Sequence, residues 1–459
     1  MSFPRYPEYK DSGVEWLGKV PGHWHISKLK HFTHFVGGGT PSRDKLEFWN
    51  GDIPWVSPKD MKSERINGAE ECITEEGLLG SSSSLIAEGR VLMVVRSGIL
   101  KHTIPVAIND VPVALNQDMK ALTFAREKCL SNFFWRWVQG LNDRLLLAWS
   151  KPGATVDSIE HDYLAETRIP LPPIDEQLQI TLFLESETAK IDGLMAEQEK
   201  LIALLKEKRQ AVIAHAVTKG LDPKVAMKDS GVEWLGEMPT HWQLKRVKHC
   251  VSNFDQGWSP QCESYPIAAE DEWGVLKVGC VNGGIFNPEE NKSLPAELDP
   301  LPELGIRKGD LLISRANTRE LVGSAAVALR DYPNLLLCDK LYRLRLDGAV
   351  TSTEFLAYYL STGQVRGQIE LSASGASSSM LNISQATILE MAIALPADEE
   401  QMEIVAFIES AQIKINTLIA EAQHAIDLLK ERRTALISAA VTGQIDVRGL
   451  IKDEQEQAA

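Results

Sequence analysis

The sequence predicts an α+β protein in which two mixed α/β domains are separated by two long helices that pack antiparallel as a coiled coil. An internal pseudo-twofold repeat supports this fold class. Residues 10–31 (KDSGVEWLGKVPGHWHISKLKH) recur at 228–249 as KDSGVEWLGEMPTHWQLKRVKH. Residues 171–222 recur at 395–446, with apolar positions at helical spacing in both copies. The segments in between diverge, so the two copies share a frame and differ in the inserts that the frame carries.

The repeat also predicts the domain organisation. At roughly 150 residues per domain, a chain of 459 residues holds about three domains or two pairs of smaller modules. The expected parts are a first variable domain at 1–170 with the frame segment 10–31, a central helical segment at 171–222, a second variable domain at 223–394 with the frame segment 228–249, and a C-terminal helical segment and tail at 395–459.

The frame segments contain a misleading motif. Gly13–Lys19 spells G-x-x-x-x-G-K, as in a phosphate-binding loop, but Val20 replaces the Ser or Thr that would ligate magnesium. The second copy has Glu237 in place of the lysine, so we expect no nucleotide site there. Large apolar side chains more plausibly attach these segments to the long helices or contribute to a partner surface. The residues expected in this role are Trp16, Trp24, Trp234 and Trp242.

The inserts are expected to be mixed domains of roughly 120 to 140 residues each. Apolar runs predict strands at 91–95 and 103–108 in the first insert, and at 275–278, 311–314 and 341–346 in the second. Helical patterns occur near 131–149 and 353–360. The short apolar runs could equally be buried helix segments.

The repeated helical segments carry sustained apolar stripes. The positions are Ile180, Leu184, Ile191, Leu194, Leu201, Leu205, Val212 and Ala216 in the first copy, and Ile404, Ile408, Ile415, Leu418, Ile426, Leu429, Leu436 and Val441 in the second. Prolines before each segment and Gly220 and Gly443 after them predict helices of about 60 Å. Two independent amphipathic helices would be one explanation. Antiparallel packing is favoured because both stripes are wider than one small domain can cover. Four residues are expected to carry the packing: Ile191, Leu205, Ile415 and Leu429.

The charge distribution indicates where nucleic acid could bind. The chain as a whole is acidic, with a net charge of -15, which argues against binding nucleic acid over its whole surface. Basic residues nevertheless cluster at 89–109 and 307–345, where they could contact phosphates, and amide side chains nearby could read purine edges. Half or more of such charges are ordinarily solvated. The candidate DNA contacts are Lys59, Arg96, Lys101, His102, Asn116 and Gln117 in the first insert, and Lys277, Arg315, Asn317, Arg319 and Lys340 in the second.

Other patterns exclude several function classes. The six cysteines form no C-x-x-C pair, so we expect them to be reduced and mostly buried, and we expect no metal site. His23 and His241 have no nearby Ser, Cys or carboxylate set that would make a catalytic triad. No apolar stretch approaches about 18 residues, and the N-terminus lacks a signal-peptide core. We therefore expect a non-catalytic cytoplasmic chain without membrane contact.

Three motifs together identify a family. They are the duplicated KDSGVEWLG-x-x-P-x-H-W openings, the stretch from GGGTPS to GDIPWV at 37–56, and the LP-x-x-[DE]-E-Q helices that end in VTKG or VTG. Over essentially the whole chain, the sequence resembles the DNA-specificity subunit of type I restriction-modification systems. The second insert departs from the pattern, since it has DQGWSPQ at 255–261 where the first has GGGTPSR.

The resemblance implies two target recognition domains held apart by the helix pair, each reading one half of a bipartite, asymmetric sequence in double-stranded DNA. It also implies two modification subunits, which carry S-adenosylmethionine and methylate adenine N6, and two restriction subunits, which use ATP and magnesium to translocate and cleave. The chain itself would hold no cofactor. A tandem-repeat scaffold that binds proteins and dimerises through its helices is the alternative.

Overall fold

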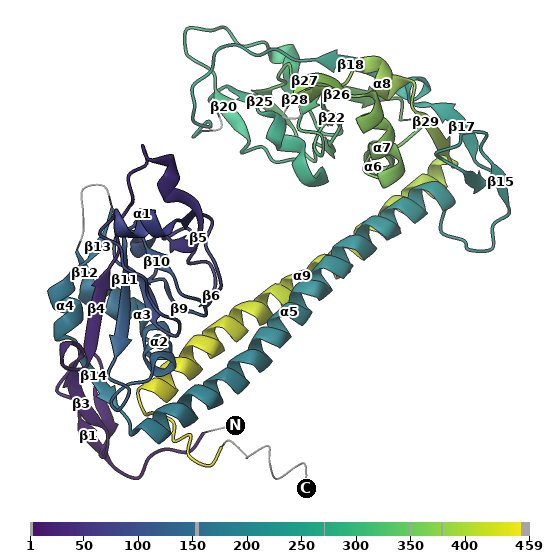
Figure 1. The fold of residues 1–459 in the computed structure, drawn as a ribbon. Helices are drawn as coiled ribbons and strands as arrows, with labels where there is room; N and C mark the ends of the chain where they lie inside the picture. The colour runs from purple at the N-terminus through teal and green to yellow at the C-terminus, as the bar shows by residue number, and fades with distance from the viewer. Residues whose placement is uncertain (1–2, 152–155, 270, 349, 378–379, 451–459) are drawn as a thin grey trace. The chain divides into compact units, whose positions relative to one another are not determined.

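The computed structural model describes residues 3–151, 156–269, 271–348, 350–377 and 380–450. The chain forms two compact units. Unit 1 comprises the residues up to Gln198 together with those from His424 onward, and unit 2 comprises Glu199–Gln423. Each unit contains one α/β domain and parts of the two long helices, α5 (Ile174–Lys219) and α9 (Asp398–Val441), as Figure 1 shows. The predicted fold class is confirmed.

The domain of unit 1 is built on a five-stranded sheet. Its strand order is β4 (Thr33–Gly37), β11 (Met119–Phe124), β8 (Val91–Val94), β9 (Val106–Asn109) and β6 (Arg65–Ile66). A smaller sheet contains β10 (Ala114–Leu115), β5 (Trp49–Val56) and β7 (Cys72–Ile73). The helices of the domain are α1 (Glu75–Leu79), α2 (Ser131–Gly140), α3 (Asn142–Trp149) and α4 (His161–Glu166). A separate strand pair is β12 (Ser150–Lys151) with β13 (Ser158–Ile159).

The domain of unit 2 repeats this plan. Its central sheet has the order β18 (Val251–Gln256), β26 (Leu341–Leu346), β22 (Leu311–Ser314) and β24 (Ala325–Val327). Two further sheets are β20 (Asn291–Ser293), β19 (Gly274–Leu276), β25 (Tyr332–Leu336) and β21 (Gly305–Ile306), and then β23 (Ala316–Asn317), β28 (Met380–Asn382) and β27 (Ser374–Ser377). The helices are α6 (Thr353–Leu360), α7 (Gly363–Ser372) and α8 (Gln385–Leu389).

The two domains share strand register although their sequences diverge. In unit 1, Gly37 of β4 pairs with Lys120 of β11, and in unit 2, Gln256 of β18 pairs with Tyr342 of β26. The next strand is again antiparallel in both sheets, β8 beside β11 and β22 beside β26. Residues can therefore be matched between the inserts by register. The predicted strands at 91–95, 311–314 and 341–346 and the predicted helix at 353–360 are confirmed.

The frame segments form the same short elements in both copies. In unit 1, β1 (Tyr9–Asp11) pairs with β2 (Lys19–Pro21), and β3 (His25–Lys28) pairs with β14 (Arg168–Leu171). In unit 2, β15 (Met227–Asp229) pairs with β16 (Glu237–Pro239), and β17 (Gln243–Arg246) pairs with β29 (Ala392–Leu395). The strands that end each variable domain thus return the chain to its frame segment immediately before the long helix begins.

A buried carboxylate attaches each frame segment to a long helix. Glu176 of α5 is 5% exposed and accepts hydrogen bonds from the Trp24 indole Nε1 at 2.9 Å and the Tyr6 hydroxyl at 2.5 Å. In the second copy, Glu400 of α9 accepts a bond from the Trp242 indole at 3.1 Å. His23 lies within hydrogen-bonding distance of Glu176, and His241 lies within hydrogen-bonding distance of Glu400. Both buried tryptophans therefore fix the frame to the helices.

The glutamine that follows each of these glutamates bonds the variable domain to the same helix. Gln177 is fully buried, and its amide donates to the Lys128 and Pro172 carbonyls while its oxygen accepts from the Leu130 N–H. Gln401, also fully buried, makes matching bonds around residues 350–352 and 396. Buried amides need such complete pairing. The repeated E-Q dipeptide thus joins frame, helix and variable domain.

Exposed ion pairs repeat with the frame. Glu166 accepts hydrogen bonds from Lys28 and Lys30, which together lower the pKa of its carboxyl to about 2. At the matching place in unit 2, Glu390 binds Arg246 and Lys248, and the pKa of its carboxyl is again lowered. The charge pattern of the frame is therefore duplicated along with its apolar anchors.

The long helices begin and end where the sequence predicts. Gly220 and Gly443 follow them with φ values of 79° and 73°, a conformation that favours glycine. In unit 1, Arg433 of α9 binds Asp192 of α5 at 2.9 Å, and in unit 2, Arg209 of α5 donates to Asn416 of α9 at 3.2 Å. The helices therefore pack antiparallel within each unit (Figure 1).

The stripe expected to bury between the helices is only partly correct. Ile191, Leu205 and Ile415 are buried, and Leu429 packs half-buried against the core of unit 1. Leu194, Leu201 and Leu418 are instead 48%, 43% and 48% exposed. Thr188 is also buried, and its hydroxyl donates to the Leu184 carbonyl, so the hydroxyl is not left unpaired.

Candidate nucleic-acid interface

The glycine-rich loop of the first insert is held against the end of the central sheet. The loop follows β4, and the Gly39 N–H donates to the Leu115 carbonyl at 2.8 Å. A Cβ atom at Gly38 would lie 2.1 Å from the Asn116 carbonyl oxygen, so only glycine fits this close approach. The buried Trp55 indole also donates to the Gly39 carbonyl at 2.9 Å. The loop is therefore fixed in place by packing and backbone hydrogen bonds.

Two exposed polar side chains meet at this loop. The Thr40 hydroxyl donates to Oε1 of Gln117, one of the predicted contacts. Its neighbour Asn116 is only 9% exposed, and its Oδ1 accepts from the Asp118 N–H at 2.5 Å. Asn116 thus shapes the turn, while the pair formed by Thr40 and Gln117 faces solvent.

Arg43 is a third polar residue of this loop and was not among the contacts predicted from the sequence. Its guanidinium lies 3.8 Å from the centre of the Trp49 ring and makes two hydrogen bonds to Glu71. These bonds lower the pKa of the Glu71 carboxyl. The signal lay in the spacing of Arg43 and the two tryptophans of the GGGTPS to IPWV stretch, because a planar guanidinium stacks well on indole.

The other candidates of the first insert are separately placed. Arg96 binds Asp118 through Nε at 2.6 Å, so much of its charge is already balanced. Lys101 and His102 are exposed at the short helical turn 98–101. Lys59 is exposed after β5. Among these four, only Arg96 has a side-chain partner next to the Thr40–Gln117 pair.

The second insert builds the same loop from different residues. Gly257 follows β18, and a Cβ atom there would lie 2.0 Å from the Leu337 carbonyl oxygen. The Trp258 N–H donates to that carbonyl at 3.0 Å. The Ser259 hydroxyl then donates to Oδ1 of Asp339. Residues 256–262 and the GGGTPSR stretch at 37–43 therefore occupy equivalent positions, which their sequences alone did not establish.

Of the predicted contacts of the second insert, Arg315 is bonded to this loop. Arg315 is half-buried and donates through Nη1 to the Asp339 carbonyl at 3.2 Å. Asn317 lies within 3.4 Å of Ser314 and Asn282, and Lys340 and Arg319 are exposed. Lys277 is half-buried after β19. Arg315 thus supports the backbone beneath Asp339.

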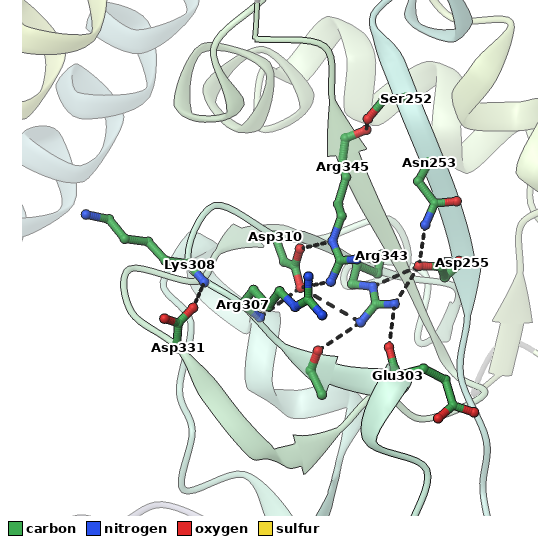
Figure 2. A network of polar contacts seen from close by, with 11 residues as sticks. Ser252, Asn253, Asp255, Glu303, Arg307, Lys308, Asp310, Asp331, Arg343 and Arg345 are labelled. Atoms are coloured by element: carbon green, nitrogen blue, oxygen red, sulfur yellow. Dashed lines mark hydrogen bonds and ion pairs between the residues drawn. The ribbon is translucent and has the colours of Figure 1, made fainter.

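The basic cluster counted at 307–345 is partly an internal network (Figure 2). Arg343 is 3% exposed and binds Asp255 at 2.6 Å, while its Nη1 donates to the Gly305 carbonyl. Arg345 binds Asp310, itself 2% exposed, at 2.7 Å. The bond to Asp310 raises the pKa of Arg345. The two acids thus balance two of the positive charges in the basic cluster. Arg343 is therefore not placed to meet a phosphate, and the charge of Arg345 is balanced by Asp310.

The described residues offer no metal cluster, disulfide or membrane-spanning helix. No group of three or more His, Cys, Asp or Glu side chains there could hold a metal ion. The six cysteines are free, and four of them are buried. No helix among those residues combines the length and apolar character needed to cross a membrane.

Two like domains with different polar side chains at one loop position, carried on a repeated frame, define a duplicated binding protein. A sequence model described as the type I restriction modification DNA specificity domain matches residues 21–203 and 286–426. The chain therefore belongs to the family of type I restriction-modification DNA specificity subunits.

The most informative relatives differ in coverage. The chain is 41% identical over 180 residues to the EcoR124I/EcoR124II specificity subunit of Escherichia coli, a match that spans 39% of this chain and 41% of that one. It is 22% identical over 455 residues to the EcoKI specificity subunit of Escherichia coli (strain K12), covering 96% and 95%. The first relative is thus matched over less than half of its length, and the second over nearly all of it.

Solved structures agree on the fold. A chain from a study of complex assembly and conformational transition of the type I R-M system superposes with a TM-score of 0.66 at 19% identity, covering 92% of this chain and 98% of that one. The HsdS subunit from Thermoanaerobacter tengcongensis gives a TM-score of 0.51 at 17% identity, covering 93% and 98%. At these identities the likeness shows the fold alone.

Proposed function

We propose that this chain reads a bipartite DNA sequence, with each variable domain recognising one half. The observation that carries the proposal is the pair of equivalent loops. Both are fixed by a glycine against the end of the central sheet, yet one presents Thr40 and Gln117 and the other presents Ser259 and Asp339. A constant scaffold with different polar side chains at one position is what two different half-sites require.

The partners belong to the same proposal. A net charge of -15 leaves little phosphate neutralisation to this chain itself. Two modification subunits, which carry S-adenosylmethionine, would supply much of the basic surface, and two restriction subunits would use ATP and magnesium. The chain itself would catalyse no reaction. It would fix the position of the complex on the DNA and determine which sequence is bound.

A binding experiment tests the proposal. The chain is co-expressed with its modification subunit, and the complex selects from a library of random DNA duplexes. We expect enrichment of two short half-sites separated by a spacer of fixed length, and no binding advantage over scrambled duplex for any other pattern. Enrichment of no sequence by an assembled complex would contradict the proposal.

A domain exchange tests the division of labour. Replacing residues 32–150 with the corresponding segment of a relative keeps the buried hydrogen bonds of Trp24 and Tyr6 to Glu176, because all three residues lie outside the exchanged segment. We expect one half-site to change and the other to remain. Loss of both half-sites by a folded, assembled chimera would contradict independent reading by the two domains.

A further inference from the structure

The equivalent loops carry a more specific inference, which rests on the proposed function. Strand register matches Gly37 with Gln256 and Lys120 with Tyr342. Counting along both strands from these pairs matches Thr40 with Ser259 and Gln117 with Asp339. In unit 1 the Thr40 hydroxyl donates to the Gln117 side chain, and in unit 2 the Ser259 hydroxyl donates to the Asp339 side chain. Both domains therefore contain a hydroxyl residue bonded to a second polar side chain, which is an amide in unit 1 and a carboxylate in unit 2.

Both pairs are fixed by the structure beneath them. The glycine two residues before each hydroxyl residue, Gly38 or Gly257, approaches the opposite backbone too closely for any side chain. The Asp339 backbone carbonyl accepts from Arg315, and the Asp339 N–H donates to the Ser259 hydroxyl at 3.3 Å. Thr40, Gln117 and Ser259 are exposed, and Asp339 is half-buried. Polar side chains that are held in place and still reach solvent can discriminate between ligands with little loss of entropy.

The two pairs differ in the hydrogen bonds that they still offer. The Thr40 hydroxyl occupies one lone pair of Gln117 Oε1, which leaves another lone pair and two amide hydrogens. Adenine presents the complementary N7 acceptor and N6 amino donor in the major groove. Asp339 is acceptor-only when ionised, and it suits the N4 amino group of cytosine.

We propose that Gln117 and Asp339 are the residues that discriminate one base pair in each half of the target. Gln117 selects adenine in the half read by unit 1, and Asp339 selects cytosine in the half read by unit 2. Thr40 and Ser259 are positioning residues, since each orients the side chain that meets the base.

Reciprocal substitutions test this assignment. Asp339→Asn gives the second domain an amide, and Gln117→Glu gives the first domain an acceptor-only carboxylate, with few changes in shape. Each variant is assembled with the modification subunit, and competition binding is measured on every single-base variant of the sequence selected by the wild-type complex. We expect Asp339→Asn to move the preference at one base pair from cytosine toward adenine, and Gln117→Glu to do the reverse in the other half. The expected change is about 5- to 150-fold at that base pair and little elsewhere.

Two controls separate base reading from charge and from folding. Glu297→Gln removes one exposed negative charge from the same domain as Asp339, and should alter affinity for all sequences alike. Thr40→Val removes the hydroxyl and should weaken discrimination at the base pair assigned to Gln117. Thr40→Ser keeps the hydroxyl and should restore it, which a purely structural role of the methyl group would not predict.

The possible failures are distinguishable. If the wild-type complex selects a sequence and both reciprocal variants, when assembled, give profiles parallel to wild type, this inference is overturned and the proposed function stands. A change spread evenly over many base pairs would also overturn it. If the wild-type complex selects no sequence, the proposed function and this inference fail together.

Discussion

The two frame carboxylates should differ in their contribution to stability, although they occupy matching positions in the repeat. Glu176→Ala leaves the indole N–H of Trp24 and the hydroxyl of Tyr6 without partners, and those residues are 0% and 3% exposed. Glu400→Ala leaves the indole of Trp242 without its partner, at a carboxylate whose side chain is 28% exposed. Burial and the Glu176 carboxylate raise the pKa of Tyr6, so its hydroxyl stays protonated and continues to need an acceptor.

The magnitudes follow from the number of stranded donors. Each buried donor left without an acceptor costs about 1 to 3 kcal/mol. We therefore expect Glu176→Ala, which strands two donors, to destabilise unit 1 by about 2 to 6 kcal/mol, and Glu400→Ala, which strands one, to destabilise unit 2 by about 1 to 3 kcal/mol. Glu176→Gln keeps one acceptor oxygen and should lie between wild type and Glu176→Ala.

Hydrogen exchange is the appropriate assay because a chain of two units need not unfold in one step. Backbone amides of 10–31 should exchange much faster in Glu176→Ala, and those of 228–249 moderately faster in Glu400→Ala. Asp175→Ala and Glu399→Ala change exposed acids one residue earlier and serve as matched controls with small effects. Equal acceleration in the two copies, or a larger effect in the second, would refute the reasoning from stranded donors.

Three further predictions concern charge, length and base reading. Because its two lysine partners lower the pKa of Glu166 from 4.5 to about 2, their stabilising effect is present above pH 4.5 and should disappear as the pH falls toward 2; a carboxyl titration by NMR that places its midpoint near 4.5 would contradict this. One heptad of about 10 Å inserted in the middle of each long helix should lengthen the DNA spacer by roughly three base pairs, as read from selected sequences, and an unchanged spacer in an active complex would oppose the idea. Arg315→Ala should relax the preference at the base pair assigned to Asp339, whereas Lys340→Ala should weaken binding to all sequences and change the slope of log affinity against log salt by about one. Competition binding with single-base variants at two salt concentrations separates the two effects. Matching profiles for the two variants would count against the distinction.

The sequence by itself determined the repeat, the long helices and the tryptophan anchors. Helix boundaries followed from local signals, since the prolines before α5 and α9 and the glycines after them act within a few residues of the chain. Trp24 and Trp242 were found because large aromatic residues in a duplicated segment have few roles besides packing. The strand at 311–314 followed from a continuous apolar run, and the strand at 341–346 from apolar residues that recur between Arg343 and Arg345.

Only the tertiary structure decided which polar residues meet. Asn116 and Gln117 are adjacent in sequence, yet one is buried in a turn and the other is paired with Thr40, 77 positions away. Arg343 and Arg345 add to the basic cluster in the sequence, but the fold places Asp255 and Asp310 beside them. The equivalence of Gln117 and Asp339 likewise depends on strand register, because pairing between distant strands fixes positions that local sequence does not encode.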